Sequence, residues 1–350
     1  MSIKVELFFT SKKVTFYMIK HAYIFIVKCR IKYCLMVLLS CCVFTQAQNK
    51  RALLVGLSHY GKATGWNDIH GTNDIDLIKT KLKGFSIKEL RNSSATYDNI
   101  ISELRSLERE SKEGDTIYIH LSGHGQPVED YNGDELDGWD ESFIPFDAHM
   151  IYNKLTYDGS KHLTDDILHK HYELLQKRLG SKGVLIVVID ACHSGESYRG
   201  EDDFSDFFLF DEEICDSSII ESAISEIDDY EYFERGTALG FSKNKKEYTV
   251  KKNTAKNRVI IKRQRASSTI LLLESCLSSQ KSMEIDILLK DRQGRTRHYF
   301  CGPLSYSIYK TICKKNYIST NMDWVKCLND TFSQIMYRRG KQQLVIEYTE

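Results

Sequence analysis

The chain has 350 residues, of which 42% are hydrophobic, and its formal net charge is +0. This apolar content is ample for a core, and the balanced charge argues against nucleic acid as a partner, because nucleic-acid binders usually carry a basic surplus. The chain has only three prolines and 20 glycines, which argues against long disordered linkers.

The first 47 residues have the layout of a secretory leader. An apolar run from Tyr33 to Phe44 follows a basic region and precedes the small-residue ending Thr45-Gln46-Ala47. Because this run is too short for a comfortable bilayer anchor, we expect a cleaved signal peptide. We therefore expect a secreted or periplasmic protein that has no stable membrane span after cleavage. We also expect translation to begin at Met18 or later, which makes residues 1–17 a start-site artefact. A retained membrane anchor and a lipoprotein signal at Cys41 stay open as alternatives.

Strands and helices alternate over residues 48–350, which we expect to form one domain. Such alternation predicts a doubly wound, mostly parallel sheet with helices on both faces. We expect six strands, of which Val184–Ile189 is a continuous aliphatic run, as in strands buried on both faces. The other five strands are expected at Arg51–Ser58, Ser86–Leu90, Asp115–Leu121, Thr269–Leu273 and Gln343–Tyr348.

A charged insert over residues 200–266 interrupts this rhythm. Residues 201–234 contain many acidic residues and no lysine or arginine, whereas residues 243–265 are rich in bases. Blocks of opposite sign between two strands are typical of an exposed surface segment. Self-processing within the basic half is a second interpretation.

Two short motifs each follow a predicted strand and carry a reactive side chain. His120-Leu121-Ser122-Gly123-His124-Gly125 follows one strand, and Asp190-Ala191-Cys192-His193-Ser194-Gly195 follows another. If the strands are parallel neighbours, His124 and Cys192 emerge at the same carboxyl edge, where open α/β sheets place their sites. A histidine that activates a cysteine is the minimum equipment of thiolate catalysis. The backbone N–H groups of Gly125 and Cys192 are candidate oxyanion donors.

The two motifs closely resemble those of the metacaspase branch of the caspase-like cysteine peptidases, peptidase family C14 of clan CD. The segments Gly71-Thr72-Asn73-Asp74 and Leu163-Thr164-Asp165-Asp166, together with the acidic loop from Gly133 to Glu141, extend the resemblance. It implies a caspase-like fold, a His124/Cys192 dyad, and endopeptidase cleavage through a thioester. Glu274 stands where the family usually has small residues, which affects the expected shape of the pocket.

The expected substrates are proteins or peptides with a basic residue at the cleavage position. Asp190 lies two residues before Cys192 and therefore faces the same side of an extended chain. Its carboxylate would bind arginine or lysine, which metacaspases prefer, although capping of the following helix is an alternative role for it. Further pocket candidates are Asp137, Asp140 and Ser275.

No cofactor is required by this chemistry, but some metacaspases use calcium. The carboxylates of the acidic loop supply suitable oxygen ligands, although salt bridges or loop solvation explain the cluster equally well. The candidate calcium ligands are Asp134, Asp137, Asp140 and Glu141.

Two other functions remain open on the sequence. One is a catalytically silent caspase-like interaction module, against which the intact His124 and Cys192 argue. The other is a different clan CD chemistry, such as transpeptidation or self-cleavage alone. A nucleotide site is disfavoured, because no Gly-x-Gly-x-x-Gly follows the first strand.

Overall fold

The computed structural model describes residues 23–32, 48–133, 135, 138–191, 211–212, 234–237, 239–243, 260–263, 267–277, 280, 282–290, 295–336 and 342–349. The chain divides into two compact units, Met1–Gln48 and Asn49–Glu350. In the first unit, residues 23–32 form a helix, and the expected apolar leader over residues 33–47 lies outside the described residues. Among the described residues, none of the helices is long and apolar enough to cross a membrane.

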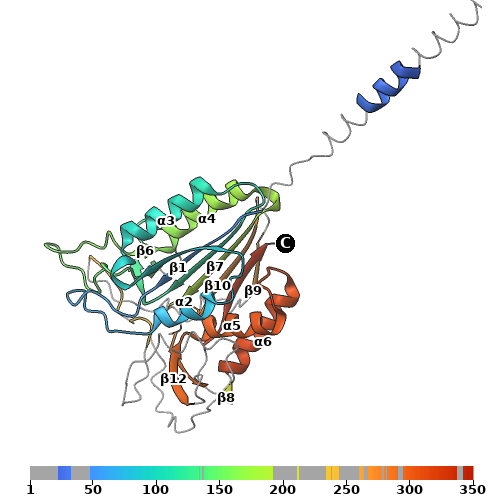
Figure 1. Ribbon diagram of the computed structural model, residues 1–350. Coiled ribbons are helices and arrows are strands. Elements are labelled where there is room, and N and C mark those ends of the chain that lie inside the picture. Colours follow the sequence, from blue (N-terminus) through green and yellow to red (C-terminus); the bar gives the residue numbers. More distant parts are fainter. Residues whose placement is uncertain are drawn as a thin grey trace, which may run out of the picture. The chain divides into compact units, whose positions relative to one another are not determined.

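The second unit is built on one large sheet (Figure 1). This sheet contains all six expected strands. Its strand order is β2-β1-β3-β7-β10-β13-β9, and the neighbours are parallel except for the antiparallel β10–β13 pair. The strands are β1 (Lys50–Gly56), β2 (Ser86–Arg91), β3 (Thr116–Ser122), β7 (Val184–Asp190), β10 (Thr269–Glu274), β13 (Val345–Thr349) and β9 (Ile260–Arg263). The α/β class and the mostly parallel sheet are confirmed.

The expectation of six strands needs one correction. The seventh strand, β9, comes from the basic half of the insert. Only two of its four residues are apolar, and the surrounding lysines and arginines make the strand pattern hard to recognise in the sequence. It pairs in parallel with β13 at the edge of the sheet. The insert therefore contributes to the sheet instead of being only a surface segment.

Helices cover both faces of the sheet, and alternate residues of each strand supply two separate cores. The helices α3 (Tyr97–Glu110) and α4 (Asp165–Leu179) cover one face (Figure 1), where Leu53, Ile119 and Val187 are buried. On the other face, Leu54, Tyr118 and Val188 pack with the remaining helices. Those helices are α2 (Gly71–Lys79), α5 (Pro303–Lys315) and α6 (Met322–Met336).

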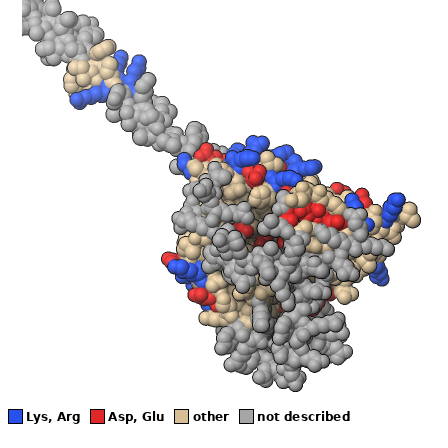
Figure 2. Space-filling view, turned by 180° about the vertical axis from the view of Figure 1, so that it is seen from behind, with Lys and Arg blue, Asp and Glu red and all other residues tan. Residues whose placement is uncertain are grey.

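Two small sheets flank the large one and were not expected from the sequence. One contains β4 (Gly125–Glu129), β5 (Trp139–Phe143) and β6 (Leu163–Thr164), and the other β8 (Asp211–Glu212), β11 (Ile285–Lys290) and β12 (Thr296–Cys301). These strands are short and have few consecutive aliphatic residues, so their periodicity is weak. The described surface seen from behind carries acidic and basic side chains side by side (Figure 2).

Candidate active site

The candidate site lies where β3 and β7 end side by side. In this parallel pair Ser122 is opposite Asp190. His124 therefore lies two residues after the end of β3, and Asp190 is the last residue of β7. Cys192 lies outside the described residues, which stop at Ala191 on this side. The carbonyl of Ala191 accepts a hydrogen bond from Ser275 Oγ at 2.9 Å. Ser275 thus fixes the backbone immediately before the candidate nucleophile.

His124 is held in one orientation by its surroundings. Its ring Nε2 lies 2.9 Å from the carbonyl oxygen of Asn67, and the ring stacks on Trp66 at a centroid distance of 4.9 Å. Because a carbonyl only accepts, Nε2 carries the proton and Nδ1 keeps a free lone pair in the neutral ring. Nδ1 is buried and has no hydrogen-bond partner among the described residues.

Burial also keeps the His124 ring neutral. Desolvation lowers its pKa from 6.5 to about 4, although the hydrogen bond to Asn67 acts in the opposite direction. At neutral pH the ring is therefore uncharged, with Nδ1 unprotonated. This is the state in which an imidazole accepts a proton from a thiol.

The backbone N–H of Gly125 already makes a hydrogen bond within the chain. Its N–H, an expected oxyanion donor, donates to the carbonyl oxygen of Arg235 at 3.0 Å. The donor therefore already contacts a peptide carbonyl of the same chain. Gly123 must be glycine here, because a Cβ atom would lie 2.9 Å from Tyr60 Oη.

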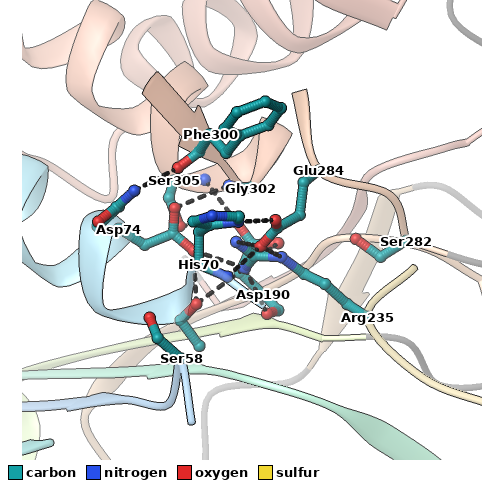
Figure 3. A network of polar contacts seen from close by, with 12 residues as sticks. Ser58, His70, Asp74, Asp190, Arg235, Ser282, Glu284, Phe300, Gly302 and Ser305 are labelled. Atoms are coloured by element: carbon teal, nitrogen blue, oxygen red, sulfur yellow. Dashed lines mark hydrogen bonds and ion pairs between the residues drawn. The ribbon is translucent and has the colours of Figure 1, made fainter. Parts of the chain in front are cut away.

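A buried acidic pocket lies beside these residues and holds the guanidinium of Arg235 (Figure 3). Arg235 Nη1 lies 2.5 Å from Asp74 Oδ2, and Nη2 lies 2.9 Å from Glu284 Oε1. Asp190 Oδ1 is 3.6 Å from Nη1. All four side chains have 0% exposure.

One hydroxyl group and one backbone N–H complete the pocket around Arg235. Ser122 Oγ donates to Asp74 at 2.5 Å and lies 2.8 Å from Arg235 Nη1. The N–H of Gly302 donates to the other oxygen of Asp74 at 2.7 Å. A buried charge of this kind is tolerated only when it is paired and hydrogen-bonded.

Asp190 lies in the pocket beside Arg235 and, in addition, caps a distant helix. Its expected contact with the basic residue of a substrate stays a prediction. Its Oδ2 accepts hydrogen bonds from the N–H and Oγ of Ser305, in the first turn of α5. It therefore caps α5, which is far along the chain, whereas the helix expected directly after it falls on residues outside the described ones. Gly302 makes this approach possible, because a Cβ atom there would lie 2.1 Å from Asp190 Oδ2.

The protonation of the pocket follows from burial and from Arg235. Desolvation raises the pKa values of Asp74 and Asp190, and the Arg235 charge counteracts it. For Glu284, Arg235 and His70 outweigh the effect of burial, so its pKa is lowered. Three carboxyl groups around one cation make a strong site for a basic side chain.

The remaining predicted residues fall in other places. Asp140 and Glu141 are neighbours on β5, so their side chains point to opposite faces of that strand and do not face a common ion. Asp134 and Asp137 lie outside the described residues. Within the described part of the chain, no group of three potential metal ligands is brought together, and calcium binding stays a prediction.

Four residues of the site were not predicted from the sequence: Asp74, Ser122, Glu284 and Arg235. Asp74 and Ser122 stood inside motifs that were noted only as family signatures. Glu284 reaches the pocket from a segment without any motif. Arg235 had a usable signal, because it is the first basic residue after the acidic run of residues 201–234.

The fold and the site together define a caspase-like α/β protein, and comparisons with known proteins agree. Residues 50–199 match the family model for the metacaspase, peptidase C14 domain. The chain is 34% identical over 168 residues to Metacaspase-1 of Plasmodium falciparum, covering 44% of this chain and 25% of that protein. Over these residues the chain is similar to the metacaspase, peptidase C14 domain.

Two further similarities are weaker. Metacaspase-1 of Mycosarcoma maydis is 26% identical over 257 residues, covering 69% of this chain and 59% of that protein. A crystal structure of a Geobacter sulfurreducens protein shares 17% identity at a TM-score of 0.47, covering 86% of this chain and 92% of that one. The chain spans only about a quarter to three fifths of the length of these two metacaspases.

Proposed function

We propose that the protein is a cysteine endopeptidase that cleaves after arginine or lysine, with His124 and Cys192 as the catalytic dyad. The observation that carries the proposal is the pocket of Asp74, Asp190 and Glu284, which binds a guanidinium at the carboxyl edge of the sheet beside His124. The family match supports the same chemistry.

The proposed roles draw on the contacts of the described residues and, for Cys192, on the resemblance of its motif. His124, with Nδ1 available, takes the thiol proton of Cys192 and later gives it to the leaving amine. The Cys192 thiolate attacks the peptide carbonyl and forms a thioester, which water then hydrolyses. The N–H of Gly125 stabilises the negative oxygen of the tetrahedral intermediate. Asp74, Asp190 and Glu284, which hold the Arg235 guanidinium in this structure, bind the basic side chain that precedes the cleaved bond once Arg235 is displaced.

Labelling with an arginyl chloromethyl ketone tests the proposal. We expect stoichiometric addition to Cys192, located by peptide mass mapping, and protection by excess arginyl peptide. A matched aspartyl ketone should label far more slowly, because the carboxylates of the pocket repel it. Absence of labelling by the arginyl reagent would leave the silent interaction module as the better interpretation.

A further inference from the structure

The imidazole ring of His124 lies against two aromatic side chains, Tyr60 and Trp66, which both come from the loop between β1 and α2. The indole of Trp66 stacks on the ring, with the two centroids 4.9 Å apart and an interplanar angle of 27°. The ring of Tyr60 is tilted by 41° at a centroid distance of 5.0 Å. All three side chains are buried. The ring of His124 therefore contacts aromatic faces where an exposed histidine would contact water.

Two hydrogen bonds fix the indole of Trp66 relative to His124. The Nε1–H of Trp66 donates to the carbonyl of Ala148, in the segment after β5, at 3.1 Å. The next residue, Asn67, accepts a hydrogen bond from Nε2 of His124 through its carbonyl at 2.9 Å. Two consecutive residues thus contact the face and the edge of the same imidazole. The backbone of this loop therefore sets the stacking.

Protonation of His124 places a positive charge where little balances it. Among the described residues, Nε2 donates to a carbonyl and Nδ1 has no hydrogen-bond partner, so no carboxylate bonds the ring directly. Burial has the largest effect on the pKa of His124 and lowers it; the Asn67 carbonyl and the charge of Glu284 raise it, and the guanidinium of Arg235 lowers it. Tyr60 stays a neutral phenol, because burial raises its pKa. A buried cation of this kind needs a further source of stabilisation.

We propose that Trp66 is a positioning residue for the reaction, whose indole face stabilises the positively charged ring of His124 after Nδ1 has taken up a proton. Indole is the aromatic side chain that attracts cations best, and it does so within about 6 Å of its centroid. The separation of 4.9 Å falls within this range. The inference rests on the proposed peptidase function, in which His124 takes the thiol proton and returns it to the leaving amine.

The contact between Trp66 and His124 favours the charged ring over the neutral one. A neutral imidazole gains only packing from the indole face, whereas the imidazolium also gains electrostatic attraction. An interaction that strengthens as the reaction proceeds lowers the barrier instead of only binding the resting state. The stacked indole thus offsets part of the cost of charging a buried base, and the ring stays neutral at rest.

Replacing tryptophan by its mono-, di- and trifluorinated analogues tests the proposal, because fluorine withdraws electrons from the indole face and barely changes its shape. NMR of ring-labelled histidine follows the titration of His124, assigned by the signal missing in His124→Gln. We expect the pKa of His124 to fall stepwise along the series, by about 0.5 for three fluorines. A pKa that does not change with fluorination would overturn the proposal.

Trp66→Phe is the matched control, since the same labelling then reaches only the other two tryptophans of the chain, Trp139 and Trp324. In this variant the pKa of His124 should not depend on fluorination. An equal fall in the control would assign the effect to the other two indoles and overturn the role of Trp66. Circular dichroism on each protein checks that the fold is kept.

Turnover of an arginyl fluorogenic peptide at neutral pH provides the second readout. We expect kcat to fall by up to about threefold from the unsubstituted to the trifluorinated protein, at constant KM, and to stay constant along the Trp66→Phe series. A constant kcat alongside a falling pKa would overturn the positioning role and leave the proposed function intact. A wild type that never turns over the peptide would count against the proposed function, and the titration alone would then decide whether Trp66 stabilises the charged ring.

Discussion

Arg235 and Asp74 form a fully buried ion pair, with Nη1 and Oδ2 2.5 Å apart and neither side chain exposed to solvent. The two residues are separated by 161 positions in the sequence. The pair therefore joins the start of α2 to the end of the acidic run in the insert. It also places the guanidinium of Arg235, from the same chain, in the pocket.

Asp74→Asn should weaken the pocket and the fold together. Removing one partner of a buried ion pair typically costs about 3 kcal/mol of unfolding free energy, measured here by urea denaturation. For arginyl peptides we expect kcat/KM to fall about 100-fold, which corresponds to a similar energy. Asp76→Asn is the control on the same helix, because Asp76 pairs with Arg91 at the partly exposed surface. Equal effects of the two substitutions would contradict the pocket.

His124→Gln should abolish most activity without unfolding the protein. General acid–base catalysis by a histidine contributes roughly 100- to 10,000-fold, so we expect a loss of kcat in that range, measured on an arginyl peptide. His59→Gln serves as the control, since the His59 side chain is 66% exposed and pairs with Asp68. Near-normal kcat in His124→Gln, with the fold intact by circular dichroism, would remove His124 from the reaction.

His162 should make the stability of the protein depend on pH. Burial lowers its pKa from 6.5 to about 3, so the unfolded chain takes up the proton before the folded one does. Wild-type stability should therefore fall as the pH drops below about 6.5, by up to about 1.4 kcal/mol per pH unit from this group. His162→Gln removes that contribution, so the difference in unfolding free energy between the two proteins must shrink toward low pH. A difference that is constant from pH 7 to pH 4 would contradict this account.

Phe241→Ala should loosen the segment that follows Arg235. Truncating a buried phenylalanine costs about 3–5 kcal/mol, and Gly159 packs so closely on this ring that a Cβ atom there would lie 2.4 Å from it. Leu239→Ala in the same segment is the control, because Leu239 is 51% exposed and should change stability by less than about 0.5 kcal/mol. Thermal unfolding measures both; similar melting temperatures for the two variants would contradict a stabilising role for the buried Phe241 ring.

The large sheet could be predicted from sequence because its strands are aliphatic runs bounded by turns. Val184–Asp190 and Thr269–Glu274 are clear examples. The small sheets and β9 could not be predicted, since their strands carry charged or mixed residues. These strands form because they pair with segments that are distant in the sequence. The edge position of His124 and Asp190 follows from the parallel strand order alone. In contrast, Glu284 and Arg235 join the site through contacts between distant segments, which no local pattern encodes.

A matched panel of arginyl, lysyl and aspartyl fluorogenic peptides, run on the wild type beside Cys192→Ala, tests the central claim most directly. The account predicts hydrolysis after arginine and lysine, very slow or absent hydrolysis after aspartate, and no activity in Cys192→Ala. A preference for aspartate, or activity that survives the loss of the Cys192 thiol, would contradict it.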